Sequence, residues 1–429
     1  MDSLVGPSPS DGAPTGTNRS ADGRPGPALP SEPAMTMPDV TAAVVVVGGG
    51  FGGLYTALAL AAERHHPPIL LVEPQERFLF LPLLYELLSG ELQSWEIAPR
   101  YDSLLAGRGV AWLQDRVVRV DLAARCLHTE AGRRIPWQRL VLATGATTDT
   151  FGIPGAESHS LSFRSLADVE RLQELVQHLA DSGRPLQRLA VVGGGPSGVE
   201  LACKLADLTA GKAVVELIEQ GETLLPSSRS FNREQAQLSL QRRDVRVRTR
   251  TQVVEVGSDH VVLRRLPEGE QEVLPVQGVI WTAGQRCRTP QISPEVGADR
   301  RGRLPCGTDL RLRGHDSVFV VGDLAAVPQV EPTAEVSLPT TAQVAFQQAP
   351  VVAANLLRSL RGEPLQDFRW NDLGEMLSLG RGEAALTGAG ITLAGPAAFQ
   401  VRRLAYLARL PRLSLQVKAA AGWLAALTP

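Results

Sequence analysis

The sequence predicts an α/β fold in which two strand–turn–helix–strand units share one chain, the second inserted into the first. Two apolar runs lead directly into glycine turns of the pattern GxGxxG, formed by Gly48, Gly50 and Gly53 and by Gly193, Gly195 and Gly198. Each turn precedes a segment with helical spacing of apolar residues, then a second apolar run that ends in an acid, Glu73 or Glu219. A later strand, Val318–Val321, returns the chain to the first unit.

Each position in such a unit has a physical role. The first glycine permits a tight turn, the second lets the backbone approach a pyrophosphate, and the third lets the helix pack on the strand. The helix N-terminus attracts the anion, and the acid accepts hydrogen bonds from a ribose diol. One such turn is weak evidence because glycine-rich turns are common, but two complete units predict two dinucleotide sites.

Composition narrows the class of protein. The 429 residues suggest two to three domains, and 44% hydrophobic with 21% charged residues is typical of a globular protein. A net charge of −2 argues against a nucleic-acid partner. Four cysteines without a CxxC pair exclude the usual dithiol centre, and the scattered histidines predict no metal site.

The N-terminal residues 1–38 are rich in Pro, Gly and Ser and predict a disordered tail. An alternative is that Met35 or Met37 is the true start of the protein. No run of 18 or more apolar residues occurs, so no membrane span is predicted.

In the first half, residues 41–64 predict a strand, turn and helix, and residues 69–73 a second strand. The segment 78–90 is apolar but broken by Pro82, which predicts a buried loop and short helix over a flat apolar group. Residues 110–130 alternate as strands do. The strand 139–143 delivers the chain to Thr144 and Gly145, a turn of small residues where the backbone can approach a cofactor.

In the second half, we expect helices at 165–182 and 230–243 and strands at 245–256, 259–266 and 271–282, the last leading into Gly284. Gly322 and Asp323 follow the returning strand. Asp323 is either the N-cap of the next segment or, at a strand's carboxyl end, a ligand of a cofactor's polyol chain. The two complete units favour the second role.

A helix is predicted at 340–352, where Gln343 and Gln347 lie four residues apart beside Ala342. Two amides on an otherwise apolar helix can orient a carbonyl ligand. The alternative is that both glutamines face solvent.

The C-terminal region has no acid after Glu383. It carries five basic residues: Arg402, Arg403, Arg409, Arg412 and Lys418. A helix near residue 400 places Val401 and Leu404 on one side and Arg402 and Arg409 on the other. This pattern favours amphipathic helices that lie in a membrane interface, with cations toward anionic headgroups. The alternative is terminal helices packed on the core or on a second subunit.

Two dinucleotide sites in one chain suggest hydride transfer between a nicotinamide and a flavin. Because no dithiol is present, the apolar 78–90 loop, the glutamine-bearing helix and the C-terminal helices point to a lipophilic quinone as acceptor.

Eight motifs occur in order: VVVVGGGFGGL, FLPLLYELLSGEL, LVLATGA, FGIPG, VVGGGPSGVELA, VIWTAG, VFVVGD and TTAQVAFQQA. Together they resemble the type II NAD(P)H:quinone oxidoreductases over about residues 40–429. The tail, LGEMLSLGRGEAAL with LAYLARLPRLSLQVKAAAGW, is similar to the demethylphylloquinone reductase branch of cyanobacteria and plastids. That branch reduces demethylphylloquinone so that its ring can be methylated toward phylloquinone (vitamin K1).

The resemblance implies a set of site residues. FAD would be held by Gly48, Gly50, Gly53, Glu73, Thr144, Gly145, Gly322 and Asp323. NAD(P)H would be held by Gly193, Gly195, Gly198 and Glu219, with Gly284 also bordering a cofactor. Ala342, Gln343 and Gln347 match the quinone motif AQxAxQQ. Glu200 would lie near the nicotinamide–flavin contact and handle a proton or the quinone; the alternative is a buried carboxylate stabilised by the helix dipole.

The resemblance also implies a domain plan: an FAD domain at 39–160 and 291–362, an NAD(P)H domain at 161–290, and a membrane-associating region at 363–429. The enzyme would be peripheral to the cytoplasmic side of a membrane, thylakoid or plasma membrane if cyanobacterial, and a homodimer by analogy. Glu219 favours NADH by repelling a 2′-phosphate, while the branch is associated with NADPH, for which Arg229 could compensate.

Other functions stay open at this stage. They are a respiratory enzyme acting on plastoquinone or ubiquinone, a soluble reductase of ferredoxin or rubredoxin, a sulfide:quinone reductase, and a nucleotide-sensing protein with a vestigial flavin site.

Overall fold

The computed structural model describes residues 44–184, 187–328 and 338–425, and the tail predicted at 1–38 lies outside them. The described residues belong to one compact unit.

A five-stranded parallel sheet of order β20-β7-β1-β2-β3 carries the first glycine turn. Its strands are β1 (Val44–Val47), β2 (Ile69–Val72), β3 (Val110–Leu113), β7 (Arg139–Leu142) and β20 (Val318–Val320). The runs VVVV and ILLV are buried at every residue, because helices and loops cover both faces of a parallel sheet. The carboxyl end of this sheet therefore lies at the first turn and its acid.

A second five-stranded parallel sheet, of order β12-β11-β10-β16-β9, carries the second turn. Its strands are β9 (Ser160–Leu161), β10 (Gln187–Val192), β11 (Ala213–Ile218), β12 (Arg246–Arg248) and β16 (Gly278–Trp281). In both sheets the strand that enters the glycine turn is central, flanked on one side by the strand that ends in the acid. All of the second sheet lies between β7 and β20 in sequence, so the predicted insertion and α/β fold are confirmed.

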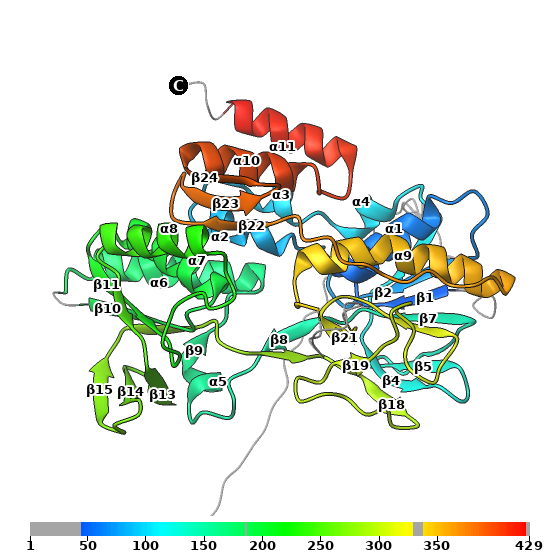
Figure 1. The fold of residues 1–429 in the computed structure, drawn as a ribbon, viewed down its shortest axis with the longest axis horizontal. Helices are drawn as coiled ribbons and strands as arrows, with labels where there is room; N and C mark the ends of the chain where they lie inside the picture. The colour runs from blue at the N-terminus through cyan, green and yellow to red at the C-terminus, as the bar shows by residue number, and fades with distance from the viewer. Residues whose placement is uncertain (1–43, 185–186, 329–337, 426–429) are drawn as a thin grey trace, which may run out of the picture. The chain divides into compact units, whose positions relative to one another are not determined.

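Smaller sheets complete the two halves. They are β4 (Val117–Asp121), β5 (Cys126–Thr129), β6 (Arg134–Pro136) and β18 (Gln291–Ser293); β13 (Thr251–Val256), β14 (His260–Arg265) and β15 (Gln271–Pro275); and β19 (Leu304–Pro305) with β21 (Ala325–Ala326). The strands β8 (Ala146–Thr148) and β17 (Gln285–Cys287) form an antiparallel pair between the two larger sheets (Figure 1).

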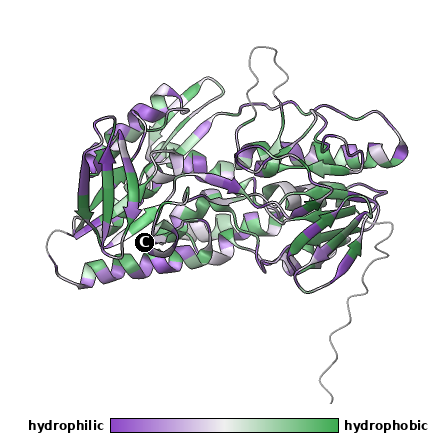
Figure 2. Cartoon of the chain, turned by 90° about the horizontal axis from the view of Figure 1, so that it is seen from below, coloured by the Kyte–Doolittle hydropathy of each residue, from purple (hydrophilic) through white to green (hydrophobic). Residues whose placement is uncertain are grey.

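Helices cover the sheets, and several of them carry both hydrophobic and hydrophilic residues (Figure 2). They are α1 (Phe51–Ala61), α2 (Leu84–Leu88), α3 (Ser94–Ile97), α4 (Tyr101–Leu105), α5 (Ala156–His159), α6 (Leu166–Asp181), α7 (Pro196–Thr209), α8 (Ser230–Arg242) and α9 (Ala342–Arg361), with 3₁₀ turns η2 (Leu81–Leu83) and η3 (Gly322–Leu324). The helix α9 lies beside α1 and runs beyond the predicted 340–352, because Leu356 and Leu357 continue its buried stripe.

The chain ends in an antiparallel sheet and two helices, which Figure 1 shows stacked on one another. They are β22 (Glu375–Ser378), β23 (Ala384–Gly388), β24 (Ile391–Gly395), α10 (Pro396–Leu407) and α11 (Leu413–Ala425). Among the described residues, every helix is too short or too polar to cross a membrane.

Candidate active site

The two glycine turns have the same geometry. Gly48 and Gly193 adopt φ of +99° and +112°, which disfavours a side chain. A Cβ on Gly53 would lie 1.8 Å from the Gly48 carbonyl oxygen, and a Cβ on Gly198 would lie 1.8 Å from that of Gly193. The third glycine of each turn is therefore required for the helix to pack against the turn.

The middle glycine of each turn is not required by packing within the protein. A Cβ on Gly50 or on Gly195 would meet no heavy atom within 4 Å, and both residues border a large cavity. Each is the N-cap of its helix, α1 or α7, and neither helix has a side-chain cap there. Free backbone N–H groups at a helix N-terminus, with open space before them, fit the pyrophosphate of a dinucleotide.

The acids that end β2 and β11 are tied back to the turns. Glu73 accepts hydrogen bonds from the N–H groups of Gly49 (2.7 Å) and Gln75 (2.8 Å). Glu219 accepts them from Gly194 (2.6 Å) and Gly221 (2.6 Å). Burial raises the pKa of Glu73, and its backbone hydrogen bonds oppose that shift. Both carboxylates are thus held at the place where a ribose would lie.

The cavity between the two units has a volume of about 1210 Å³. The predicted residues that line it are Gly48, Gly50, Glu73, Thr144, Gly145, Gly195, Glu200, Gly322, Asp323, Ala342 and Gln343. The other predicted residues, Gly53, Gly193, Gly198, Glu219, Gly284 and Gln347, are not part of this lining. Gly284 has φ of +74°, and a Cβ there would lie 2.5 Å from the Phe151 ring.

Asp323 lies in η3, directly after β20. Burial raises the pKa of Asp323, while the Arg164 guanidinium lowers it. Arg164 also lines the cavity and was not predicted from the sequence. The Gly322 N–H donates to Gln348 Oε1 over 2.7 Å, which fixes the turn that presents Asp323. Acid and cation together fit a cofactor that carries both hydroxyl and phosphate groups.

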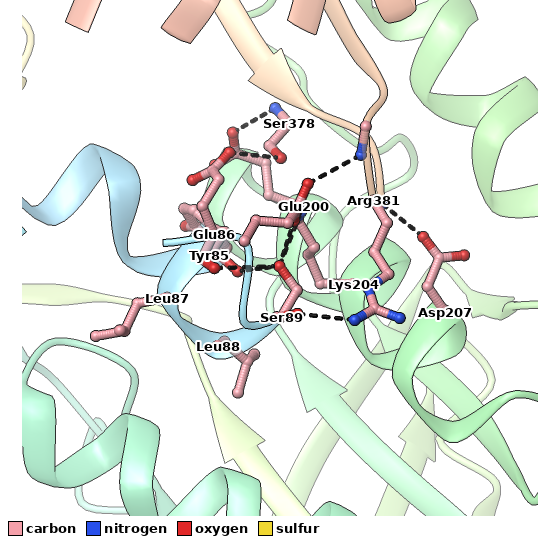
Figure 3. Close-up of polar contacts among 12 residues, drawn as sticks. Tyr85, Glu86, Leu87, Leu88, Ser89, Glu200, Lys204, Asp207, Ser378 and Arg381 are labelled. Atoms are coloured by element: carbon pink, nitrogen blue, oxygen red, sulfur yellow. Dashed lines mark hydrogen bonds and ion pairs between the residues drawn. The ribbon is translucent and has the colours of Figure 1, made fainter. Parts of the chain in front are cut away.

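Glu200, in α7, lies on the cavity wall with 7% of its surface exposed. Its Oε1 accepts a hydrogen bond from the Ser378 N–H over 2.7 Å, and the Tyr85 side chain also hydrogen-bonds to it. Burial raises the pKa of Glu200 to about 7, although the Arg402 guanidinium, 3.8 Å away, lowers it. Figure 3 shows how residues from α2, α7 and β22 meet here.

The position of Arg402 differs from the sequence prediction. The helical pattern placed this residue on the polar, outward face of the C-terminal helix, but its side chain is only 1% exposed. It forms an ion pair with the buried Glu86 and donates to the Pro82 carbonyl over 2.6 Å. The second carboxylate oxygen of Glu86 has no hydrogen-bond partner among the described residues. Helix α10 therefore contributes to the active-site wall.

The two glutamines of α9 hydrogen-bond to the backbone of the chain that follows the helix. Gln343 Nε2 donates to the Gly374 carbonyl over 3.0 Å, and Gln343 Oε1 accepts from the Leu373 N–H over 3.3 Å. Gln347 exchanges two hydrogen bonds with the Asn371 backbone, at 2.9 and 3.1 Å. In this arrangement the amides hold residues 371–374 in place.

All four cysteines are free. Burial raises the pKa of the thiols of Cys203 and Cys306 to about 12 and that of Cys287 to about 11. A reactive thiolate is disfavoured at these three positions, which argues against the sulfide:quinone alternative.

The comparisons with known proteins agree with this geometry. A family profile described as pyridine nucleotide-disulphide oxidoreductase matches residues 42–349. The chain is 38% identical to the demethylphylloquinone reductase NdbB of Synechocystis sp., over 90% of this chain and 97% of that protein. It is 33% identical to the alternative NAD(P)H-ubiquinone oxidoreductase C1 of Arabidopsis thaliana, over 89% and 80%. The structure of NDH2 from Plasmodium falciparum with NADH superposes with a TM-score of 0.79 at 17% identity, over 90% of this chain and 98% of that one.

Two nucleotide turns that face one cavity define a flavoprotein that receives electrons from a pyridine nucleotide. The chain belongs to the pyridine nucleotide-disulphide oxidoreductase family and, within it, to the type II NAD(P)H:quinone oxidoreductases. It is an enzyme that uses FAD and NAD(P)H and has a quinone as its substrate.

Proposed function

We propose that this enzyme reduces a lipophilic naphthoquinone, of the class of demethylphylloquinone, at a membrane surface. The resemblance to the Synechocystis reductase, over nearly the full length of both chains, supports the naphthoquinone class. Residues 39–160 with 291–362 would form the FAD domain, 161–290 the NAD(P)H domain, and 363–429 the membrane-associating region.

In this proposal each nucleotide has its own turn and acid. Gly48, Gly50, Gly53 and Glu73, with Thr144, Gly145, Gly322 and Asp323, hold FAD; Gly193, Gly195, Gly198, Glu219 and Gly284 serve NAD(P)H. Bound at the first turn, FAD would supply the chemistry of the reaction, which is acceptance of a hydride from the nicotinamide and transfer of two electrons to the quinone.

Reduction of a quinone to a quinol by one hydride equivalent also requires one proton. Glu200 is the group we assign to this step, because its carboxyl borders the cavity and its pKa of about 7 allows it to hold a proton at neutral pH. Tyr85 and Ser378 hold the carboxyl in place. Ala342, Gln343 and Gln347 shape the quinone wall, the glutamines through residues 371–374.

The main observation in support of a quinone site is a row of aromatic side chains that extends from the cavity toward α10. Phe51 and Phe80 lie with ring centroids 5.1 Å apart, and Phe80 and Tyr406 5.7 Å apart. The cluster continues through Tyr55, which stacks on Phe51 and whose ring centroid lies 4.8 Å from that of Phe346. A flat ring with an apolar tail fits such a row of aromatic side chains better than a polar protein acceptor does.

The outer surface of α10 and α11 supports the membrane association. Leu404, Leu413 and Val417 have 61%, 73% and 59% of their surface exposed. Arg403, Arg412 and Lys418 lie on or between the same helices, whereas Arg409 borders the cavity. The Arg403 guanidinium stacks over Trp423 at 4.2 Å. Exposed apolar residues with cations and no acid favour an interface with anionic lipids. We expect a homodimer by analogy with similar folds.

The test is anaerobic stopped-flow absorbance on the purified holoenzyme. NADH or NADPH should bleach the flavin, and a naphthoquinone such as menadione should reoxidise it faster than short-chain ubiquinone or plastoquinone analogues do. Faster reoxidation by the benzoquinones would favour the respiratory alternative, for which the Arabidopsis relative named for ubiquinone gives a reason. Bleaching without reoxidation by any quinone would favour a protein acceptor.

A further inference from the structure

Residues 370–378, which we call the strap, connect the two substrate walls. At one end α9 holds the strap: Gln343 Oε1 accepts from the Trp370 indole N–H over 3.3 Å, and Gln347 pairs with the Asn371 backbone. The strap then turns at Gly374, whose φ is +100°. A Cβ there would lie 2.1 Å from the Thr387 carbonyl oxygen, so this turn is fixed by close packing.

Next, the strap holds the nucleotide-binding half. The Glu375 carboxylate accepts hydrogen bonds from Ser228 Oγ (2.5 Å), the Arg229 N–H (3.2 Å) and Asn232 Nδ2 (3.0 Å). These three donors surround the start of α8, which has no side-chain cap from its own N-cap residue, Arg229. A carboxylate at this place complements the helix dipole. Asp372 adds an ion pair with Arg229 over 2.7 Å.

This arrangement also bears on Arg229 as a ligand of a nucleotide 2′-phosphate. In the structure the Arg229 side chain is committed to Asp372, with both side chains 45% exposed. The Arg229 guanidinium, which the sequence suggested as a ligand for the 2′-phosphate of NADPH, is thus paired with Asp372 of the strap.

The strap ends at the catalytic centre. The Ser378 N–H donates to Glu200, and Ser378 Oγ donates to Glu86 Oε1 over 3.3 Å. The strap and the loop that it holds face the same cavity: Trp370, Asp372 and Glu375 border it together with Ser228 and Arg229. One short segment thus contacts the quinone wall, the nucleotide half and the proposed proton donor.

We propose that Glu375 is a positioning residue for the pyridine nucleotide. Its carboxylate holds residues 228–232 in place, and the part of this loop that borders the cavity, Ser228 and Arg229, thus presents a fixed surface to the bound nucleotide. The strap ties this position to the quinone wall through Gln343 and Gln347. The inference rests on the proposed function only for the identity of that wall, because binding of NAD(P)H is a property of the nucleotide half.

The chain offers a matched control. Glu383 also joins α8 to the C-terminal sheet, by ion pairs with Arg242 (3.2 Å) and Arg243 (3.3 Å) at the other end of the helix. Glu383 does not border the cavity. Loss of either acid weakens the same interface, but only Glu375 acts on the loop that faces the cavity.

The experiment measures flavin bleaching in the holoenzyme against NADH concentration, without a quinone. Glu375→Gln should raise the apparent Kd for NADH about tenfold, the effect of losing a charged hydrogen-bond acceptor, and change the limiting rate less than threefold. Glu383→Gln should leave both values within twofold of the parent. Equal effects of the two variants, or an unchanged Kd in Glu375→Gln, would overturn the proposal.

If Glu375→Gln does not purify with flavin, the proposal is tested with the variant Ser228→Ala. This variant removes one donor to the carboxylate, and a rise in the Kd for NADH of about threefold supports the proposal, whereas an unchanged Kd overturns it. Slow reoxidation of the parent enzyme by naphthoquinones would contradict the proposed function alone, because the NADH half-reaction is measured separately.

Discussion

The backbone N–H of Gly49 donates a hydrogen bond to the Glu73 carboxylate over 2.7 Å, and the same bond recurs at 2.6 Å between Gly194 and Glu219. In each unit the acid that would receive a ribose also fixes the turn that would receive the phosphates. A substitution at either acid should therefore disturb both the recognition of the sugar and the shape of the turn.

Glu219→Gln should shift preference toward NADPH. A carboxylate repels a 2′-phosphate, and its removal should raise the ratio of kcat/KM for NADPH over NADH by about tenfold. Steady-state kinetics with both nucleotides and a soluble dye acceptor would measure this ratio. Glu73→Gln is the control: it should weaken FAD retention and leave the ratio unchanged. An unaltered ratio in Glu219→Gln would remove this residue from nucleotide selection.

Substitution of the third glycine in each turn should affect the binding of one cofactor and not the other. Gly53→Ala should yield protein without bound flavin, because the new Cβ would overlap the Gly48 carbonyl. Gly198→Ala should retain flavin but lose bleaching by NADH, because the same overlap occurs with Gly193. Flavin absorbance per mole of protein and anaerobic titration with NADH would measure the two effects. Loss of flavin in Gly198→Ala as well would argue against separate sites.

Glu200 should control the pH dependence of quinone reduction. Burial raises its pKa to about 7, so the carboxyl is protonated below that pH and loses its proton as the pH rises through it. The rate of flavin reoxidation by menadione should fall above pH 7, approaching about tenfold per pH unit. In Glu200→Gln the rate should be low and nearly independent of pH from 6 to 8. The same pH profile in parent and variant would exclude Glu200 as the donor.

Gln343→Leu should impair both half-reactions. Loss of its amide releases Trp370, Leu373 and Gly374 from α9, so the strap should hold both the quinone wall and the nucleotide loop less firmly. We expect slower reoxidation by menadione and a rise of about threefold in the Kd for NADH. Stopped-flow traces of the two half-reactions would show this. A defect confined to reoxidation would instead indicate that the amide acts on the quinone directly.

The double substitution Leu404→Ser with Val417→Ser should reduce cosedimentation with anionic vesicles by at least about threefold, because it removes exposed apolar surface from α10 and α11. Reduction of a soluble dye by NADH should be unchanged. Val273→Ser is the matched control, since Val273 is 61% exposed on β15. Equal sedimentation of parent, control and double variant would contradict the membrane role of these helices.

The sequence predicted those features whose signal is local. The two glycine turns and their acids follow from spacing within a single unit, and β1 and β10 from short apolar runs bounded by glycine. The return of the chain at Asp323 also follows from an apolar run with an acid at its end. These features need no knowledge of which distant segments meet.

The remaining features depend on contacts between distant segments. Arg402 stands among several cations on a helix, and periodicity does not distinguish a buried ion pair with Glu86 from an exposed charge. For the neighbours Gln347 and Gln348, the spacing predicted a role for Gln347. The structure shows that the buried Gln348 accepts the hydrogen bond from the Gly322 N–H. The bond between Ser228 and Glu375 joins residues 147 positions apart, for which a single sequence gives no signal.

The matching strand order of the two sheets has an evolutionary consequence. Both place the glycine-turn strand at the centre with the acid strand beside it, although the edge strand β9 begins its unit in sequence whereas β20 closes the other. Such repetition is what duplication of one ancestral module followed by rearrangement of its connections would leave. Because each copy retains its own turn and acid, selection on one nucleotide need not compromise the other.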